Sequence, residues 1–244
     1  MDVIIQARTG SKRFPNKIFA KFLGKTILDS VIEKIKSNKN INKIIIATTK
    51  NSLDDNIEKY CNRKNILIHR GSEKNVLQRF IDVCEEYKLD KLLRICSDNP
   101  LLSSKYLDVL INHFNGNYDY CSFYTKFDEP AIIKPIGVFA EGVSRKALNV
   151  ALKKSNGDKL SLEHVTYFIH KNFSLFKIKK IPIPASLNPE LRFTIDYEAD
   201  LVMLNDLVSL VKSSDIDLIM SSYNKDDRVK EILDSHSKSY PKVF

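Results

Sequence analysis

The sequence predicts an α/β fold built on a mostly parallel β-sheet that is covered by helices on both faces. Short continuous runs of apolar residues alternate with helical patterns through the first half of the chain. Such runs are typical of strands whose two faces are both buried, and the helices between them indicate parallel crossovers. The 244 residues are enough for one large domain, taken as residues 1–244, whose core needs no disulfide or structural metal.

In the first half of the chain, strands and helices are expected in strict alternation. The helix at 27–36 illustrates the pattern, because its apolar residues recur on one face at the helical period. Asp54 and Asp55 suit the positive N-terminal end of the helix that follows the second strand. The expected strands are 3–5, 43–48, 66–68 and 91–96, and the expected helices are 27–36, 52–62, 76–87 and 103–114.

The second half departs from this rhythm. A strand is expected at 118–124, but prolines and glycines interrupt the segment from about 127 to 184, which holds one helical pattern at 144–154. We interpret the segment 127–184 as an inserted lobe or a dimer arm. The elements expected after it are a strand at 191–195 and helices at 198–212 and 216–222.

Charge and composition argue against a nucleic-acid-binding protein. The formal net charge is +9, but most of the 39 basic residues are lysines scattered along the chain, without an aromatic-interleaved RNA motif or a basic helix. Scattered lysine is typical of a solvated surface, which would also attract small anionic substrates. The arginines are more informative, because a rigid guanidinium fork suits phosphate or carboxylate. Those in segments with candidate motifs are Arg8, Arg13, Arg70, Arg79, Arg94 and Arg192.

The cysteines indicate a reducing compartment. Cys61, Cys84, Cys96 and Cys121 are widely spaced, form no CxxC pair and lie beside apolar residues, so core thiols explain them better than zinc ligands or disulfides. The N-terminal residues lack the pattern of a signal peptide, and no apolar run approaches the roughly 20 residues of a membrane span. We therefore expect a cytoplasmic protein without membrane insertion.

A cation-rich loop follows the first expected strand. Ligands of parallel α/β sheets bind beyond the carboxyl ends of the strands, so this loop is well placed for a phosphate. Gly10 lets the backbone approach a phosphate closely, while Ser11 and three cations supply a hydroxyl and charge. An ordinary basic loop is the simpler alternative. The candidate triphosphate-binding residues are Gln6, Ala7, Arg8, Gly10, Ser11, Arg13 and Lys17.

Two better-known nucleotide-binding loops are excluded by spacing. Gly24-Lys25-Thr26 resembles the end of a P-loop, but Phe19 stands where that motif requires its first glycine. No GxGxxG pattern occurs, so the dinucleotide-binding fingerprint is missing as well. The loop after the first strand is therefore of another kind.

Two aspartates far apart in the sequence each lie just past an expected strand. Asp98 and Asp196 would meet at one edge of the sheet if both strands belong to it. A carboxylate there, beside bound phosphates, is a natural ligand for Mg²⁺. For Asp98 a simple turn is the alternative interpretation, and Glu198 and Asp200 are interpreted as helix caps.

The histidines carry little signal. His164 and His170 are six residues apart and cannot share one helical face, as a pair of metal ligands would. His69, next to Arg70, is placed to reach a ligand. A structural role is nevertheless the simpler interpretation of each histidine, and no nucleophilic triad is evident.

Several segments together resemble the cytidylyltransferase family that includes CMP-sialic acid and CMP-Kdo synthetases, and most of all its spore-coat polysaccharide biosynthesis protein F-like members. The family pattern IIQAR-x-GS-x-R-x-P-x-K matches 4–17, and RGSE-x-x-VL-x-R matches 70–79. R-x-x-x-D-x-P-L matches 94–101, EHVT matches 163–166, and R-x-T-x-D-x-x-x-D-L matches 192–201. The matches occur in the family's order over nearly the whole chain.

The resemblance implies a three-layer nucleotide-binding fold like that of the nucleotide-diphospho-sugar transferases, with a dimerisation insertion and hence a homodimer. CTP would be the substrate and Mg²⁺ the metal. The implied catalytic residues are Arg8, Lys17, Asp98 and Asp196, of which the two aspartates would bind Mg²⁺. The nucleotide-binding residues that it implies beyond the loop are Arg70, Ser72 and Arg94, the first two near base and ribose.

One departure from the family pattern concerns the acceptor. Near relatives usually have Gly-Asp-Cys-Pro where this chain has Ser97-Asp98-Asn99-Pro100. The aspartate is kept, but both of its neighbours differ, so the acceptor pocket is expected to differ in shape.

The implied reaction is in-line attack of an acceptor oxygen on the α-phosphorus of CTP, with pyrophosphate leaving. The acceptor is expected to be anionic, either a sugar acid of the sialic-acid or Kdo type or a phosphonate, used in surface polysaccharide or glycan biosynthesis. Lys134 and Arg145 are candidates to bind its charge.

The alternative functions are a sugar-phosphate nucleotidyltransferase or glycosyltransferase of similar fold, and a basic RNA-binding protein. The single glycine in 6–17 argues against the glycine-rich opening of the sugar-phosphate enzymes.

Overall fold

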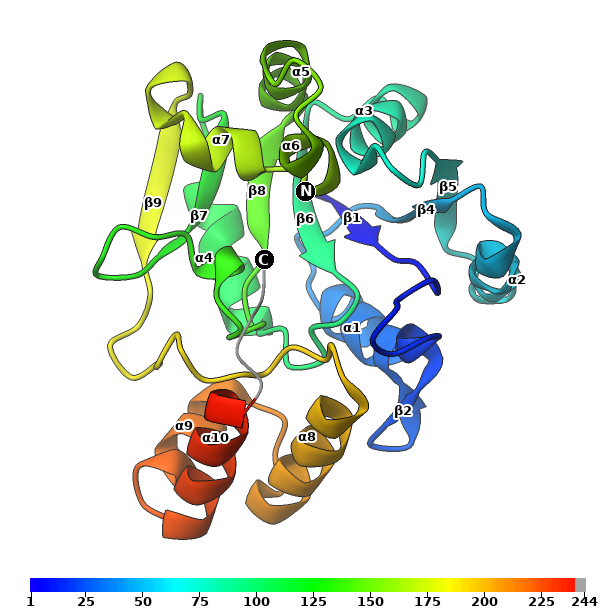
Figure 1. Ribbon diagram of the computed structural model, residues 1–244. Helices are drawn as coiled ribbons and strands as arrows, with labels where there is room; N and C mark the ends of the chain where they lie inside the picture. The colour runs from blue at the N-terminus through cyan, green and yellow to red at the C-terminus, as the bar shows by residue number, and fades with distance from the viewer. Residues whose placement is uncertain (240–244) are drawn as a thin grey trace.

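A seven-stranded sheet runs through the molecule in the computed structural model, which describes residues 1–239 (Figure 1). β8 is antiparallel to both of its neighbours, and every other pair of adjacent strands is parallel, so the predicted mostly parallel sheet is confirmed. In spatial order the strands are β5 (Leu67–Gly71), β4 (Ile44–Thr49), β1 (Asp2–Gln6), β6 (Lys91–Cys96), β8 (Glu141–Ser144), β7 (Tyr120–Tyr124) and β9 (Ile178–Pro182).

Alternate residues of the central strands enter two separate hydrophobic cores, one on each face of the sheet. Ile5 is in register with Ile46 and Ile95, and all three belong to the larger core. Ile4 and its neighbour Ile45 point the other way and belong to the smaller core. Because both faces are buried, these strands are apolar throughout, which is the pattern on which the fold prediction depends.

Helices cover both faces and so complete three layers (Figure 1). Those that contribute buried residues to the larger core are α1 (Ile27–Lys36), α2 (Asp55–Lys64), α4 (Ser104–His113), α8 (Glu198–Val211), α9 (Ile216–Tyr223) and α10 (Asp227–Ser239). Those on the smaller core are α3 (Val76–Tyr87), α5 (Arg145–Lys154) and α7 (Tyr167–Lys171), with the short α6 (Lys159–Glu163) packed beside α3 and α5.

Short elements fill the connections. A hairpin of β2 (Lys21–Phe22) and β3 (Lys25–Thr26) precedes α1. The 3₁₀ helices are η1 (Lys17–Phe19), η2 (Ser52–Asp54), η3 (Ala131–Ile133) and η4 (Phe173–Leu175). α8, α9 and α10 pack against one another and gather at one end of the sheet (Figure 1).

The strand predicted at 191–195 is wrong. All five residues from 191 to 195 are buried, as they would be in a strand that is covered on both faces. Their backbone, however, does not run alongside a strand: the N–H of Phe193 donates to the carbonyl of Pro135 (2.9 Å), and that of Ile195 to the carbonyl of Asp98 (3.0 Å). The segment therefore crosses the end of the sheet, where it meets two loops.

The segment 127–184 contributes directly to the sheet, because it contains β8 and β9. β8 lies between β6 and β7, next to the parallel half that the first part of the chain builds. A role as a dimer arm stays a prediction. Of the domain expected at 1–244, residues 240–244 lie outside the described residues. Within 1–239, no helix is long and apolar enough to cross a membrane.

The cysteines are unpaired thiols, as predicted. Burial raises the pKa of Cys61, Cys84 and Cys121 to about 12, so these thiols stay protonated and unreactive in the core. Cys96 is the exception to the prediction of core thiols, because it is only partly buried and lines a cavity at the end of β6.

Candidate active site

A cavity of about 230 Å³ opens at the carboxyl ends of β1 and β6. Parallel strands end at the same edge of a sheet, which is why side chains far apart in the sequence meet there. Among the residues that line it are five of those predicted to bind the nucleotide or the metal: Gln6, Arg13, Arg94, Asp98 and Asp196.

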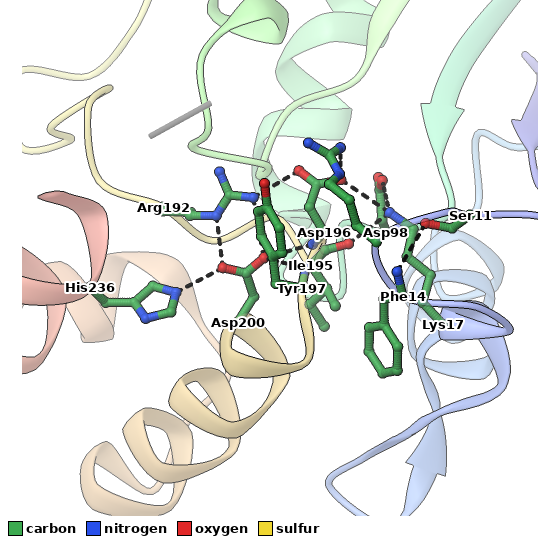
Figure 2. A network of polar contacts seen from close by, with 11 residues as sticks. Ser11, Phe14, Lys17, Asp98, Arg192, Ile195, Asp196, Tyr197, Asp200 and His236 are labelled. Carbon is green, nitrogen blue, oxygen red and sulfur yellow. Dashed lines mark hydrogen bonds and ion pairs between the residues drawn. The ribbon is translucent and has the colours of Figure 1, made fainter. Parts of the chain in front are cut away.

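Lys17 joins the two predicted aspartates. Its ammonium lies 2.7 Å from Oδ2 of Asp98 and 3.2 Å from Oδ1 of Asp196, and it also donates to the carbonyl of Ile195 at 2.7 Å (Figure 2). Burial disfavours the charged form of Lys17, but the carboxylates of Asp98 and Asp196 outweigh burial and raise its pKa. The lysine is therefore a fixed positive charge at the junction of three chain segments.

Asp196 is the most heavily contacted carboxylate of the cavity. Besides Lys17, its Oδ1 accepts from Nη2 of Arg13 at 3.2 Å, and its Oδ2 accepts from Nη2 of Arg192 at 2.8 Å. Arg13 is half exposed, whereas Arg192 is almost completely buried. Three cations thus surround one carboxylate, an arrangement that also favours phosphate oxygens beside it.

The donor set fits Mg²⁺ bound together with a nucleotide. Asp98 and Asp196 both contact the ammonium of Lys17, so their oxygens are close enough to share a metal ion. Mg²⁺ commonly takes one or two carboxylates and fills its other positions with water and substrate phosphates. Residues 1–239 hold no group of three or more acidic, cysteine or histidine side chains that could bind a metal. The phosphates would therefore have to supply further ligands.

The predicted phosphate loop is anchored by Asp54, a residue that the sequence indicated only as a helix-terminal charge. Asp54 is 2% exposed, and its Oδ1 accepts from both the N–H and the hydroxyl of Thr9 at 2.7 Å. Its Oδ2 accepts from the N–H and the hydroxyl of Thr49 at the end of β4. Burial opposes ionisation, yet the bonds from Thr49 and Thr9 outweigh burial and lower the pKa of Asp54. One buried carboxylate thus joins the loop after β1 to the loop after β4.

If the loop binds CTP, as the resemblance implies, replacing Asp54 by asparagine is expected to raise the KM for CTP about tenfold, with a smaller effect on kcat. An amide cannot accept on both sides, so Thr9 or Thr49 loses its acceptor and the loop is no longer held. The free energy of unfolding should also fall, by about 1–3 kcal/mol. Steady-state kinetics and urea unfolding test this. Asp215→Asn, which keeps a capping side chain at the start of α9, is the matched control, and an equal rise in KM there would contradict the assignment.

The rest of the loop is open to a ligand. A Cβ added at Gly10 would meet no atom within 4 Å, and Arg8 is exposed. Ser11 faces its own loop, where its Oγ accepts from the N–H of Phe14 at 3.4 Å. Ala7 is buried, and its N–H donates to the carbonyl of Ala47 in β4, so the first residue of the loop continues the pairing of β1 with β4. None of Ala7, Arg8, Gly10 and Ser11 lines the cavity itself.

Arg70 lies in β5 and Ser72 follows that strand, which is separated from β1 by β4, and neither residue lines the cavity. Arg70 forms ion pairs of 2.7 Å with both Asp55 and Glu58 of α2. Ser72 accepts from the N–H of Asn75 at 3.0 Å and so begins the turn into α3. The structure thus shows these two side chains in local contacts, and their nucleotide contacts stay a prediction.

Arg94 belongs to a buried network that forms one wall of the cavity. Its Nη1 is ion-paired with Glu141 of β8, which is completely buried and also accepts from the hydroxyl of Tyr120. Thr166 donates to both oxygens of Glu141 (2.9 and 3.1 Å), and the hydroxyl of Tyr120 lies 2.9 Å from Nε2 of His170. Burial opposes the charge of Glu141, but Arg94, His170 and Tyr120 together outweigh burial and lower its pKa to about 2. This network is a fixed, charge-balanced wall.

Several lining residues were missed by sequence reasoning. His164 and His170 both line the cavity, although they had been interpreted as structural. Glu141, which lies behind the lining residue Arg94, was missed as well, and no local pattern distinguishes it from other acids. Thr166 belongs to the EHVT segment but had no assigned role.

The two residues proposed to bind the acceptor differ in position. Lys134 lines the cavity, where it is ion-paired with Glu129 (2.9 Å) and Glu190 (3.0 Å). Arg145 forms an ion pair with Asp90, the residue before β6 begins. The cavity lies at the carboxyl end of β6, so Arg145 is at the opposite end of that strand. The assignment of Arg145 to the acceptor is therefore wrong.

Two buried oxygens point to a ligand in the cavity. Oδ1 of Asn99 and Oγ1 of Thr194 have no hydrogen-bond partner among the described residues, and both side chains line the cavity. Gly137 adopts φ +58° beside them, and a Cβ there would lie 2.8 Å from Thr194 and 3.2 Å from Asn99. Since buried polar atoms are almost always paired in native proteins, a hydroxyl or amine of a ligand is the natural partner.

Comparison with known proteins agrees with the geometry. Residues 3–231 match the family model described as Cytidylyltransferase. Protein MJ1063 of Methanocaldococcus jannaschii is 36% identical over 98% of this chain and 97% of its own. The spore coat polysaccharide biosynthesis protein SpsF of Bacillus subtilis is 30% identical over 81% of each chain. A cytidylyltransferase structure from Leptospira borgpetersenii shares the fold, with a TM-score of 0.81, 24% identity and coverage of 99% of this chain and 98% of that one.

Proposed function

This chain belongs to the cytidylyltransferase family, and from that premise we propose that it transfers CMP from CTP to an anionic acceptor, with Mg²⁺ bound by Asp98 and Asp196. The observation that carries the proposal is the position of Lys17, which holds both aspartates at the end of the predicted triphosphate loop. A nucleotidyltransferase needs cations and carboxylates in one place, and this cavity brings them together from three segments.

In this proposal the donor end of the site is the loop at 6–17. Arg8, Ser11, Arg13 and Lys17 hold the triphosphate, and the open backbone at Gly10 allows a phosphate to approach. Asp54 fixes the conformation of this loop through its hydrogen bonds from the N–H and the hydroxyl of Thr9. Mg²⁺, when bound, neutralises phosphate charge and orients the phosphates.

The reaction then needs no covalent enzyme intermediate. An acceptor oxygen bonds to the α-phosphorus of CTP and loses its proton, while the bond from the α-phosphorus to the bridging oxygen breaks and pyrophosphate leaves. Arg13 and Lys17 stabilise the negative charge that builds on the leaving group, because fixed cations need no rearrangement as the charge develops. The enzyme's contribution is position and charge.

The acceptor would occupy the part of the cavity beyond the aspartates. Asn99 and Thr194 are free to accept hydrogen bonds from its hydroxyl groups, and Lys134 and His164 line the same space. This chemistry suits a sugar acid of the Kdo or sialic-acid type, and a phosphonate is the other class to test. The likeness to SpsF supports a place in surface polysaccharide biosynthesis.

We also propose a homodimer in the cytoplasm, formed through the segment 127–184. Large apolar side chains are exposed on this segment, namely Phe127 (74%), Leu160 (44%) and Leu175 (48%). The unpaired thiols suit a reducing compartment. Sedimentation of the purified protein tests the oligomeric state.

The proposal predicts selective stabilisation by CTP. A ligand at one hundred times its Kd adds about 2.7 kcal/mol, which corresponds to a rise in Tm of roughly 5–10 °C for a chain of this size. We expect this shift with CTP and Mg²⁺ but not with ATP, GTP or UTP. A shift with another nucleotide and none with CTP would contradict the cytidine assignment.

The acceptor is identified by a screen for pyrophosphate release from CTP and Mg²⁺. The panel contains Kdo-type and sialic-acid-type sugars, small phosphonates and, as representatives of the related enzymes, sugar 1-phosphates. Turnover with a sugar acid supports the proposal as stated. Turnover with sugar 1-phosphates alone would replace it with a sugar-phosphate nucleotidyltransferase.

A further inference from the structure

Asp200 is a completely buried carboxylate at the centre of a hydrogen-bond network next to the active site (Figure 2). Its Oδ1 accepts from Nε of Arg192 (2.8 Å) and lies 2.7 Å from Nε2 of His236. Its Oδ2 accepts from the backbone N–H groups of Asp196 (2.7 Å) and Tyr197 (2.8 Å), and from Nη2 of Arg192 at 3.2 Å. Every lone-pair direction of this carboxylate is thus used by a donor.

This arrangement exceeds what a helix cap requires. As the third residue of α8, Asp200 completes a capping box with Tyr197, and one bond to that backbone N–H would suffice. Burying a charge is costly unless it is paired and hydrogen-bonded. Burial opposes the charge of Asp200, but His236 and Arg192 outweigh burial and hold its pKa well below its usual range. The carboxylate is therefore ionised and fully compensated, and it fixes several neighbours at once.

Among these neighbours is Asp196, which Asp200 holds in two ways. It binds the backbone N–H of Asp196 directly. It also accepts a hydrogen bond from Nε of Arg192, and Nη2 of the same guanidinium donates to Oδ2 of Asp196 at 2.8 Å. Both the backbone and the side chain of the proposed metal ligand are thus set by one buried carboxylate.

His236 is the member of the network that comes from farthest along the chain. It lies on α10, a helix that is packed into the larger core through Val229 and Leu233 and whose other residues are mostly exposed. A carboxylate accepts hydrogen bonds and cannot donate, so Nε2 of His236 must carry the proton in this contact. Without the imidazole of His236, Oδ1 of Asp200 would keep only the bond from Arg192. The guanidinium of Arg192 would then move away from Asp196 and toward the space that the imidazole had filled.

We propose that Asp200 and His236 are positioning residues for Asp196, so that the C-terminal helix α10 completes the active site. The inference rests on the proposed function, in which Asp196 binds Mg²⁺ beside the triphosphate. Partners that orient a metal ligand typically change metal affinity or activity by 10- to 100-fold when they are removed. The network therefore links the docking of α10 to the metal-dependent step, and it meets the triphosphate loop at 6–17 through Asp196, whose other oxygen contacts Arg13 and Lys17.

Three variants test the role of His236. His236→Leu removes the donor, His236→Gln keeps an N–H donor at a similar reach, and Tyr223→Phe removes the 2.7 Å bond from α9 to Asp234 of α10 without touching the network. We expect kcat to fall at least tenfold in His236→Leu with KM for CTP within about twofold, to recover mostly in His236→Gln, and to stay at the wild-type value in Tyr223→Phe.

Binding gives a readout that does not depend on turnover. Calorimetric titration with α,β-methylene-CTP, which cannot release pyrophosphate, is done with and without Mg²⁺. We expect His236→Leu to bind this analogue as the wild type does without Mg²⁺, and to lose the gain in affinity that Mg²⁺ gives the wild type.

Three outcomes would overturn the positioning role. They are wild-type kcat and an intact Mg²⁺ effect in His236→Leu, an equal loss in Tyr223→Phe, and a loss of metal-free affinity as large as the metal-dependent one. The last two would show that α10 contributes only general stability. A wild-type protein that neither binds the CTP analogue nor releases pyrophosphate would overturn the proposed function and the positioning role with it.

Discussion

Replacing Asp98 by asparagine is expected to lower kcat for CMP transfer by about 10²- to 10³-fold and to leave the protein folded. The carboxylate lies 2.7 Å from the ammonium of Lys17 and is partly exposed at the cavity. Its replacement therefore removes a negative charge from the reacting centre and leaves the hydrophobic core intact. The neutral amide neither balances Lys17 nor binds Mg²⁺ well. The same change at Asp196 should be at least as severe, because that carboxylate meets three cations.

The measurement is initial rates of pyrophosphate release over a range of Mg²⁺ concentrations, together with Tm for each variant. Asp217→Asn is the matched control, since Asp217 also pairs with one lysine, Lys105 at 2.5 Å, on a surface away from the cavity. It should keep wild-type rates. Full activity in both Asp98→Asn and Asp196→Asn would show that these carboxylates are not the metal ligands.

Replacing Glu141 by glutamine is expected to cost about 3–5 kcal/mol of the free energy of unfolding. Glu141 is completely buried and ion-paired with Arg94, so the neutral amide leaves a buried guanidinium without its counterion. Tyr120 and Thr166 would each also lose part of a charged acceptor. Urea unfolding measures the loss. Glu33→Gln, which breaks an exposed pair with Lys25, should cost no more than about 1 kcal/mol.

The same residue predicts a pH dependence with a definite sign. The pKa of Glu141 falls from 4.5 to about 2 on folding, so its contribution to stability is present above pH 4.5. That contribution is lost as the pH falls from about 4.5 toward 2, when the unfolded state takes up a proton first. The difference in unfolding free energy between wild type and Glu141→Gln should therefore shrink over this range. A constant difference from pH 7 to pH 3 would contradict the assignment.

The family could be predicted, and the loop at 6–17 named as the candidate donor end of the site, because both depend on local sequence; the contacts of this loop with CTP stay a prediction. Apolar strands that are buried on both faces look alike in any parallel sheet, and a cation-rich loop after the first strand carries its own signal. Asp98 and Asp196 were recognised for the same reason, since each lies just past an apolar run. The two aspartates do meet on Lys17, but for Asp196 the reason differs from the predicted one, because 191–195 is not a strand and crosses the end of the sheet beside Asp98.

The acceptor side could not be predicted, because its walls come from segments whose local patterns are irregular. Glu141 looks like an ordinary acid in the sequence, and its role appears only when β8 is placed beside β6. Arg145 looked well placed in the same segment, yet β8 is antiparallel to β6, so the residue after β8 emerges at the opposite end from the cavity. Strand direction is a property of the whole sheet.

By itself, then, the sequence determined the alternation of strands and helices and the family, and it named the loop at 6–17 and the two aspartates as candidates, because short-range periodicity and local motifs record them. Only the tertiary structure decided how these parts are held. Three single buried carboxylates show this, because each has a partner from a distant segment: Asp54 binds Thr9, Glu141 binds Arg94, and Asp200 contacts His236. A buried charge must be compensated by whatever the fold brings beside it, and no local pattern specifies that partner.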